Sequence, residues 1–333
     1  MDVERKRVFV GLSGGVDSAV SAALLKEQGA DVTGVFIKGW YPPGMPCAWA
    51  SDRRDAMRVA AHLRIPFKTL DASAEYKTHV IDYMLEEYRA GRTPNPDVMC
   101  NRDIKFGVFY RYAREQGADY IATGHYLSGE KDQRYFLWAV PKKIMEHAVF
   151  PVARREKSQV RALARRYGLP VAAKKDSQGV CFLGDVSVEE FLRAQFGEAP
   201  GDAIDSEGDV IGTHTGVLLH TIGERIALSG VRKPGPWFVE RKDVVQNILY
   251  VDKTAVRAVR EEGVVRFSQT NWIQDKSRAV SAQFRYRGPH VEGHVQHGAF
   301  FYDAILPELP VPGQSIVFFD ENDELLGGGI IEG

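Results

Sequence analysis

The stretch VFVGLSGGVDSAVSAALLKEQGA, residues 8–30, decides the fold of this chain. It begins as an apolar strand, passes through a short glycine-bearing loop and continues with the apolar spacing of a helix. Backbone N–H groups at the start of such a helix attract an anion, and the glycines let phosphate oxygens approach the backbone. The stretch therefore predicts a phosphate-binding loop between a first strand and a first helix.

The loop GLSGGVDS, residues 11–18, matches neither of two common phosphate-binding patterns. It lacks the Lys that a P-loop requires, which disfavours transfer of a γ-phosphoryl group, and it lacks the GxGxxG spacing of dinucleotide-binding folds. It instead resembles the SGGxDS loop of the PP-loop ATP pyrophosphatases. That resemblance implies an enzyme that adenylates an oxygen of its substrate and releases pyrophosphate. For the Gly-Gly pair alone, a plain glycine turn is the alternative.

Short apolar runs alternate with helical patterns over the first 120 residues. The predicted strands are 8–12, 32–37, 67–70 and 120–123, and the predicted helices are 18–28, 51–63, 73–89 and 101–116. This alternation predicts an α/β fold, a parallel sheet with helices on both faces, whose ligands bind beyond the carboxyl ends of the strands.

The pattern changes near residue 150. A basic helix at 157–167 precedes a Gly/Asp-rich stretch and then short alternating runs between regular turn signals, which predict a β-rich half ending in a small barrel. The 333 residues favour two or three domains. We expect a nucleotide-binding catalytic domain at 1–150, a small middle domain at 151–255 and a C-terminal β-barrel at 256–333.

Composition narrows the class of protein. No apolar run approaches the roughly 20 residues that span a bilayer, and the N-terminus enters a strand without a signal-peptide pattern. Three widely spaced cysteines form neither a disulfide framework nor a CxxC zinc pair. A cytoplasmic protein is therefore expected, without a membrane partner.

Charge is distributed unevenly along the chain. The net charge is −1, but the segment from Lys131 to Lys175 holds 12 Lys/Arg and 3 Asp/Glu, a net +9. A polyanion would bind this segment and be repelled elsewhere. A solvated helical face is an equally good explanation of the charge alone.

Two cysteines stand in loops with unusual flanks. In GRTPNPDVMCNRDIKF, residues 91–106, two prolines stiffen a loop that presents Asp97 and Cys100 ahead of a helix expected to start near Asn101. In KKDSQGVCFLG, residues 174–184, Cys181 follows two lysines. Both settings favour a thiolate. Taken singly, each cysteine is more often an inert core residue.

Five segments together resemble the family of tRNA-specific 2-thiouridylases: SGGVDS at 13–18, TPNPDVMCN at 93–101, ATGHY at 122–126, KDQRYFL at 131–137 and DSQGVCFLG at 176–184. The resemblance covers nearly the whole chain. It implies an enzyme that uses ATP to activate the C2 oxygen of the wobble uridine in tRNA and then replaces it with sulfur. It also implies a sulfur-relay protein that donates a persulfide, a middle domain that contacts tRNA, and a 176–186 loop that returns to the active site.

The resemblance assigns roles by position. Cys181 would carry the persulfide, Cys100 would be the nucleophile and Asp97 the acid/base. The target base would lie among Asn95, Pro96 and Asp97. ATP would be bound by Gly11, Leu12, Ser13, Gly14, Gly15, Val16, Asp17, Ser18, the backbone at Ile37, and Gly124. The tRNA would be contacted by His125, Lys131, Asp132, Gln133, Arg285, Tyr286 and Gln314.

The alternatives to these roles are structural. No metal is expected from the protein alone, although Mg²⁺ brought by ATP would fit near Asp17. A satisfied structural histidine is the alternative for His125, and an exposed strand pair is the alternative for Arg285-Tyr286.

Some features depart from the family pattern. The connection between Tyr126 and Lys131 is short, and the segment at 221–230 lacks the family's Gln-Arg-Lys-Gly run, which weakens the expected tRNA contacts of the middle domain. Cys47 matches no catalytic motif and is expected to be structural or incidental.

Three competing hypotheses stay open. They are another PP-loop ligase of the argininosuccinate or lysidine type, a sulfurtransferase acting on a different tRNA base, and a non-catalytic RNA-binding protein. The two loop cysteines disfavour the first, and the intact SGGVDS loop disfavours the last.

Overall fold

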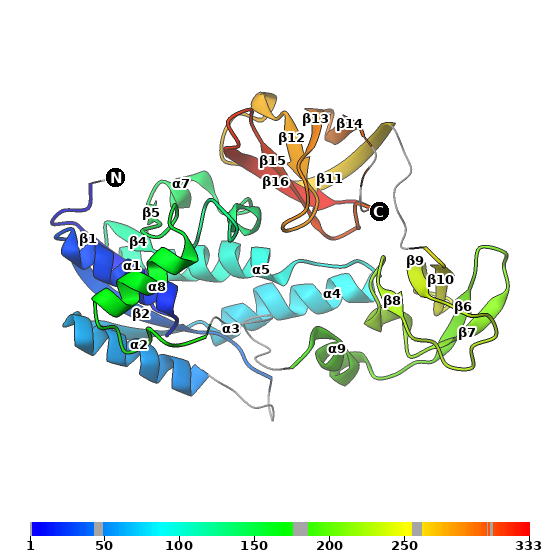
Figure 1. Ribbon diagram of the computed structural model, residues 1–333, viewed down its shortest axis with the longest axis horizontal. Helices are drawn as coiled ribbons and strands as arrows, with labels where there is room; N and C mark the ends of the chain where they lie inside the picture. Colours follow the sequence, from blue (N-terminus) through cyan, green and yellow to red (C-terminus); the bar gives the residue numbers. More distant parts are fainter. Residues whose placement is uncertain (1, 43–48, 176–185, 255–261, 305, 307–308) are drawn as a thin grey trace. The chain divides into compact units, whose positions relative to one another are not determined.

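The computed structural model describes residues 2–42, 49–175, 186–254, 262–304, 306 and 309–333. The chain divides into two compact units (Figure 1). Unit 1 comprises Met1–Ile81 and Asp97–Asp185, and unit 2 comprises Asp82–Pro96 and Val186–Gly333. The chain therefore leaves unit 1 once, for a short excursion, before it enters unit 2 for good.

Unit 1 is built on a parallel sheet of five strands in the order β3-β2-β1-β4-β5. The strands are β1 (Arg7–Gly11), β2 (Asp31–Lys38), β3 (Phe67–Asp71), β4 (Tyr120–Ala122) and β5 (Ala148–Val149). The first four confirm the predicted strands within one or two residues. The two-residue β5 was not predicted, because so short a strand has no periodicity of its own.

Helices pack on both faces of this sheet. Val8 and Val10 of β1, and Leu12 just after it, join a core with side chains of the helices α1 (Val16–Glu27), α2 (Trp49–Leu63) and α8 (Lys157–Arg166). Successive strand residues point to opposite faces, so Gly11 faces the other side. There, a Cβ on Gly11 would lie 3.6 Å from Phe109 in α6 (Phe109–Glu115). The predicted helix–sheet–helix arrangement is confirmed.

Two predicted helices contain π-helical turns. The helix expected at 73–89 runs through α3 (Ser73–Tyr76), a π-helical segment Lys77–Asp82 and α4 (Tyr83–Arg89). The helix expected at 101–116 begins earlier, with α5 (Pro96–Met99), a π-helical segment Cys100–Val108 and then α6. One further short helix, α7 (Lys142–Met145), precedes β5. Among the described residues, no helix is long and apolar enough to cross a membrane.

Helix α8 belongs to unit 1, beyond the boundary that we placed at residue 150. Val160 and Ala164 are fully buried in the core that also holds α1. The basic helix is therefore part of unit 1, which extends to Asp185.

Unit 2 contains a five-stranded sheet in the order β7-β6-β10-β9-β8. Its strands are β6 (Gly201–Ile204), β7 (Val210–His214), β8 (Arg225–Ile226), β9 (Trp237–Asp243) and β10 (Ile248–Asp252), and helix α9 (Val188–Phe196) precedes them. A small apolar core that includes Ile211, Trp237 and Leu249 holds the sheet together.

The chain ends in a closed barrel, as predicted. Its strands follow the order β11-β14-β13-β12-β15-β16. They are β11 (Glu262–Trp272), β12 (Ser281–Gln283), β13 (Val291–Gln296), β14 (Ala299–Asp303), β15 (Ser315–Phe319) and β16 (Leu325–Ile331). Aromatic side chains such as Phe300 and Phe318 fill the interior, which explains why so short a segment has its own core.

Candidate active site

The predicted phosphate-binding loop lies between the carboxyl end of β1 and the start of α1. Gly14 has a φ of +80°, a conformation that favours glycine. A Cβ at Gly14 would overlap the carbonyl oxygen of Asp52 in α2, so no larger residue fits. The Ser18 hydroxyl accepts a hydrogen bond from the Ser13 amide and donates one to the Gly15 carbonyl, both at 3.2 Å. The sequence thus fixes the backbone of this loop without a ligand.

Gly124 lies against the first turn of α1. A Cβ at this position would be 2.8 Å from the amide nitrogen of Ser18 and 2.9 Å from the carbonyl carbon of Asp17. Strand β4, which precedes Gly124, pairs in parallel with β1, so their carboxyl ends share one edge of the sheet. Ile37 lies near the same edge, with its Cδ1 3.9 Å from where a Cβ on Gly11 would be. The residues expected to bind ATP are therefore brought together, and their contact with ATP stays a prediction.

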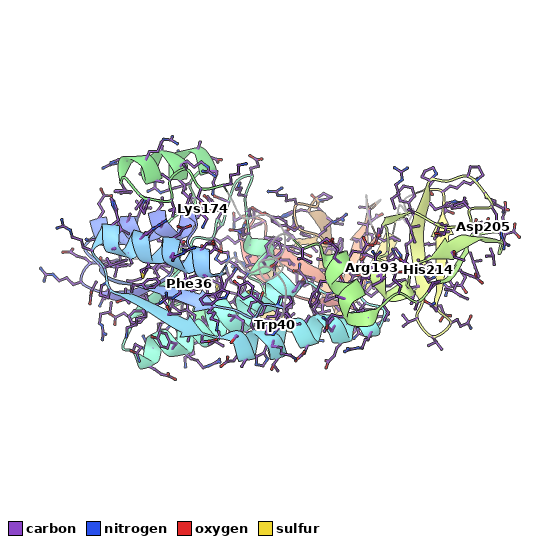
Figure 2. All side chains as sticks on the ribbon, turned by 90° about the horizontal axis from the view of Figure 1, so that it is seen from below. Phe36, Trp40, Lys174, Arg193, Asp205 and His214 are labelled. Carbon is purple, nitrogen blue, oxygen red and sulfur yellow. The ribbon has the colours of Figure 1, made fainter. Side chains whose placement is uncertain are left out.

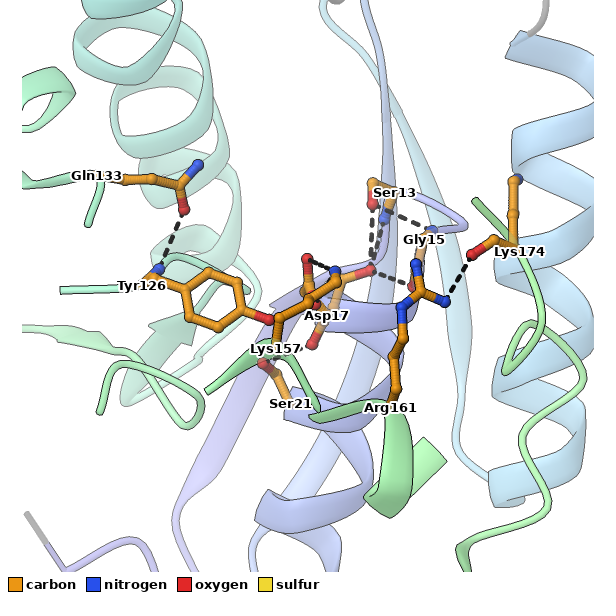
Figure 3. A network of polar contacts seen from close by, with 10 residues as sticks. Ser13, Gly15, Asp17, Ser21, Tyr126, Gln133, Lys157, Arg161 and Lys174 are labelled. Carbon is orange, nitrogen blue, oxygen red and sulfur yellow. Dashed lines mark hydrogen bonds and ion pairs between the residues drawn. The ribbon is translucent and has the colours of Figure 1, made fainter. Parts of the chain in front are cut away.

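Asp17, in the first turn of α1, is the centre of a polar cluster (Figure 3). The Lys157 ammonium lies 2.7 Å from Asp17 Oδ1 and 2.8 Å from Oδ2. The Tyr126 hydroxyl donates to Oδ1 at 2.6 Å. Lys157 is the first residue of α8, and Tyr126 follows β4. Three distant segments of unit 1 therefore place a lysine and a tyrosine beside the glycine loop.

Sequence reasoning missed Lys157 as a site residue and counted it only as one charge of the basic segment. Its signal in the sequence is weak, because it lies 140 residues from Asp17. The local pattern gives its position on the helix but not its partner. Glu156 caps α8 through a capping box with Gln159, which makes Lys157 the first helical residue. Only the packing of α8 on α1 brings its ammonium to the loop.

The polar cluster also bears on the expected magnesium site. Both carboxylate oxygens of Asp17 already bind the Lys157 ammonium. A carboxylate in that state is a poor ligand for Mg²⁺, because the cation would have to displace the lysine. The donor set around Asp17 does not fit a metal held by the protein, and we assign no step to one.

Part of the positive charge in the Lys131–Lys175 segment has partners inside unit 1. Lys174, labelled in Figure 2, binds Asp52 at 2.8 Å and Asp55 at 2.7 Å. The Arg161 guanidinium donates to the carbonyl of Lys174 at 3.1 Å, and Arg166 pairs with Glu27 at 3.4 Å. The segment therefore presents less unpaired charge to a polyanion than its composition indicates.

Asp97 and Cys100 lie one helical turn apart, on the same side of the helix that starts at Pro96. Burial raises the pKa of Asp97 above its usual value, and the positive charge of Lys105 partly offsets this effect. Cys100 is buried, with 3% of its surface exposed. A carboxyl group with a raised pKa next to a sheltered thiol is an arrangement suited to acid–base and nucleophilic chemistry.

The start of this helix corrects one prediction. We expected the helix to begin near Asn101, with Cys100 just ahead of its N-terminus. It begins at Pro96, a residue favoured at the first helical position, so Cys100 lies one turn inside and opens a π-helical segment. Such π-helical segments are rare in proteins, and many of those that occur lie at functional sites. The side chain of Asn101 donates to the carbonyl of Phe136 at 3.1 Å and ties this turn to the neighbouring loop.

His125 is buried, with 8% of its surface exposed. Its Nδ1 lies 2.8 Å from the hydroxyl of Thr123, and its ring packs against Phe106 and Phe150. Burial lowers the pKa of His125 to about 3, with a smaller contribution from Lys105, so the ring is neutral near pH 7. These are the contacts of a structural histidine, the alternative that the sequence left open, and its contact with tRNA stays a prediction.

Asp132 and Gln133 also have partners within unit 1. Asp132 accepts hydrogen bonds from the backbone and guanidinium of Arg134. The Gln133 side-chain oxygen accepts from the backbone amide of Tyr126 at 3.0 Å, and the backbone amide of Gln133 donates to the Tyr126 carbonyl at 2.9 Å. Both residues therefore close the loop that carries Tyr126 to Asp17. Lys131 is half-buried in the same loop. Contacts of the Lys131–Gln133 trio with tRNA stay predictions.

The remaining residues expected at tRNA belong to unit 2. Arg285 is exposed and Tyr286 half-buried in the turn between β12 and β13, where a polyanion has access to them. Gln314, by contrast, donates its side-chain amide to the carbonyl of Thr93 at 2.7 Å. Cys47, Cys181 and the segment 176–185 lie outside the described residues, so the predicted cysteine pair stays a prediction.

A cluster of carboxylates in unit 2 was not predicted. Asp205, labelled in Figure 2, lies with Glu207 and Asp209 in the connection from β6 to β7, in an arrangement that could hold a metal ion. The Lys233 ammonium lies 2.7 Å from a carboxylate oxygen of each. The lysine occupies the centre of the cluster, which is therefore an ion-pair network of the loop.

Comparisons with known proteins agree with this architecture. Residues 6–185 match the family described as the tRNA methyl transferase HUP domain, residues 189–253 its PRC-barrel domain, and residues 263–331 the aminomethyltransferase beta-barrel domain. These three domains, in this order, define a tRNA-modifying enzyme built on a nucleotide-binding domain.

Close relatives specify the family further. The chain is 43% identical to the tRNA-specific 2-thiouridylase MnmA of Akkermansia muciniphila, covering 98% of each chain. It is 43% identical to the enzyme of the same name from Thiobacillus denitrificans, over 98% of this chain and 99% of that one. The chain belongs to the family of tRNA-specific 2-thiouridylases, which are sulfurtransferases.

One solved structure is similar at lower identity. A 4-thiouridine synthetase in complex with RNA and ATP has a TM-score of 0.38 and 19% identity, over 55% of this chain and 46% of that one. This likeness carries no functional argument.

Proposed function

We propose that this chain is an ATP-dependent tRNA-uridine 2-sulfurtransferase. It converts C2 of the wobble uridine to the 2-thio form and releases AMP and pyrophosphate. The observation that carries the proposal is the cluster of Lys157, Asp17 and Tyr126 beside the glycine loop. Membership of the 2-thiouridylase family along 98% of the chain supports tRNA as the substrate.

The first step is adenylation of the base. The C2 oxygen of uridine attacks the α-phosphorus of ATP, a new O–P bond forms, and the bond to the β-phosphate breaks. The departing pyrophosphate carries the developing charge. Loop 11–18 supplies backbone N–H groups to it, and Lys157 supplies the ammonium that a P-loop would carry within the motif itself. Asp17 and Tyr126 position this ammonium before ATP arrives.

Asp97 is the acid/base of the reaction. Burial raises its pKa, which makes its carboxylate a stronger proton acceptor for the target base than an exposed aspartate would be. The prolines on either side of Asn95 restrict the loop that would surround the flipped base. Because the wobble base lies in a single-stranded loop, removing it from its stack costs little.

The second step is sulfur transfer. A sulfur-relay protein loads Cys181 with a persulfide, whose terminal sulfur attacks C2 and forms a C–S bond. AMP leaves as the C–O bond breaks. The Cys100 thiolate then attacks the inner sulfur, so the 2-thio base is released and a Cys100–Cys181 disulfide forms. A cellular thiol reductant restores both cysteines.

Nucleoside analysis tests the proposal. Unmodified tRNA is incubated with the protein, ATP and a protein persulfide donor, and its nucleosides are examined by mass spectrometry. We expect a gain of one sulfur at the wobble uridine, with AMP and pyrophosphate formed in equal amounts. ADP and inorganic phosphate as products, or sulfur on another base, would contradict it.

A further inference from the structure

The loop that leads into Asn95, Pro96 and Asp97 is held by the C-terminal barrel. The Thr93 amide donates to the carbonyl of Pro312 at 2.9 Å. The Gln314 side-chain nitrogen donates to the carbonyl of Thr93 at 2.7 Å and to that of Pro94 at 3.3 Å. The backbone polar groups of the loop are thus bound by one turn, residues 311–314, which lies more than 200 residues further along the chain.

This turn is itself fixed to the barrel. The Gly313 amide donates to the carbonyl of Ile331 at 3.0 Å, and the Ile331 amide donates to that of Gln314 at 2.8 Å. Gly313 has a φ of +90°, and a Cβ there would lie 3.0 Å from both the amide nitrogen and the carbonyl oxygen of Thr93. The turn, which leads into strand β15 of the closed barrel, therefore approaches Thr93 so closely that a larger residue than glycine would be crowded.

The other end of the loop is also fixed. Nε and Nη2 of Arg92 each donate to one carboxylate oxygen of Glu87 at 2.6 Å. Because Glu87 lies in α4, this ion pair joins the loop to that helix. Pro94 and Pro96 restrict the backbone on each side of Asn95. The Gln314 side chain binds the carbonyls of Thr93 and Pro94, the two residues that precede Asn95.

We propose that Gln314 is a positioning residue for target-base recognition, a role that rests on the proposed function. Its side-chain nitrogen donates to the carbonyls of Thr93 and Pro94, two neighbouring residues of the loop. Gln314 holds the loop in the conformation that presents Asn95. The barrel thereby acts on Asn95 through the protein backbone, within unit 2.

Hydrogen–deuterium exchange of the full-length protein without tRNA tests this role directly. The variants are Gln314→Ala and the isosteric Gln314→Glu, which has no amide to donate. Because prolines have no amide hydrogen, a peptide spanning 91–97 reports on Arg92, Thr93, Asn95 and Asp97. We expect its exchange to be roughly three- to tenfold faster in both variants, the effect of losing one or two hydrogen bonds.

The matched control is Gln274→Ala in the same barrel. The Gln274 side chain contacts Glu324 and Arg278 on the barrel's own surface, so its loss leaves the 91–97 peptide unchanged. A peptide spanning 315–319 in each sample shows whether the barrel as a whole has loosened. Faster exchange confined to the 91–97 peptide supports positioning, and equal acceleration of both peptides contradicts it.

Kinetics separate positioning from contact with tRNA. For the Gln314 variants we expect kcat for thiolation to fall about tenfold while the Kd for tRNA changes less than twofold. Unchanged exchange with a weakened Kd would overturn the proposal and make Gln314 a direct tRNA contact. A wild-type protein that thiolates no tRNA would refute the proposed function, yet the exchange result would still decide whether Gln314 holds the loop.

Discussion

Lys157 and Asp17 are 140 residues apart in the chain, yet the lysine ammonium contacts both oxygens of the aspartate, at 2.7 Å and 2.8 Å. The pair lies beside a glycine loop that has no lysine of its own. In the proposed function, the Lys157 ammonium supplies from helix α8 the positive charge for phosphate binding that the loop itself lacks. It also makes the site depend on the packing of α8.

Replacing Lys157 tests this dependence. Lys157→Ala should reduce tRNA-dependent pyrophosphate formation by a factor on the order of 10²–10³, the usual effect of removing a group that stabilises charge in a transition state. Lys157→Arg should retain part of the activity because the charge remains. Pyrophosphate release is the measurement, and Lys6→Ala at an exposed position is the control. Equal rates for Lys157→Ala and wild type would refute the role.

Asp17 should be needed for adenylation and not for tRNA affinity. Asp17→Ala leaves the Lys157 ammonium without its partner and should abolish formation of AMP and pyrophosphate. The Kd for tRNA, measured by filter binding, should stay within about twofold. A large loss of tRNA affinity would mean that the cluster serves the nucleic acid instead of ATP.

The basic segment should make tRNA binding sensitive to salt. We expect a log–log slope of about −0.7 to −0.9 for each phosphate that is neutralised. Arg165 is exposed, whereas Arg161 and Arg166 have partners inside unit 1, so Arg165→Glu tests the surface with the least disturbance. It should weaken binding and make the slope shallower. If affinity is unchanged, α8 has an ordinary solvated face.

The two cysteines of the proposed relay should be equally necessary. Cys100→Ser and Cys181→Ser should each eliminate 2-thiouridine while sparing tRNA binding, and Cys47→Ser should have no comparable effect. In at least one state of the cycle, we expect their Cα atoms to approach within roughly 4.4–6.8 Å, as a disulfide requires. Full thiolation by Cys181→Ser with a protein persulfide donor would exclude the relay.

Burial of His125 should make stability depend on pH. Burial lowers its pKa to about 3, against 6.5 for the ordinary side chain, so between these values the unfolded state binds a proton that the folded state does not. The free energy of unfolding is therefore not reduced by His125 above pH 6.5, and it decreases as the pH falls below that value. From pH 7 to pH 5 the loss is about 2 kcal/mol.

Substitution of His125 checks the origin of this effect. In urea unfolding at pH 5 and pH 7, His125→Gln should show a smaller difference in free energy of unfolding than wild type. The exposed His79→Gln is the control for the substitution itself. An unchanged pH dependence in His125→Gln would assign the effect to other groups.

Local patterns predicted most of the elements. The alternation of β1, α1 and β2 and the turn-punctuated run of β-strands after residue 200 depend on neighbours in the chain, and the structure confirms them. The partners of Lys157, His125 and Gln314 depend on contacts between segments 100 or more residues apart or on burial, and neither is visible in a local pattern. For the same reason the boundary at residue 150 was placed too early, because only packing on α1 shows that α8 belongs to unit 1.

The excursion of residues 82–96 into unit 2 decides how this protein can be dissected. Within unit 2, Tyr88 is hydrogen-bonded with Thr221, Arg89 stacks on Phe196 and Thr93 is bound by Pro312. A truncated fragment ending at residue 185 keeps the glycine loop but deprives helix α4 of these partners. A fragment starting at residue 186 lacks the helix itself. Neither product of a single cut is a self-contained folding unit, so limited proteolysis near residue 185 should leave two pieces that remain associated.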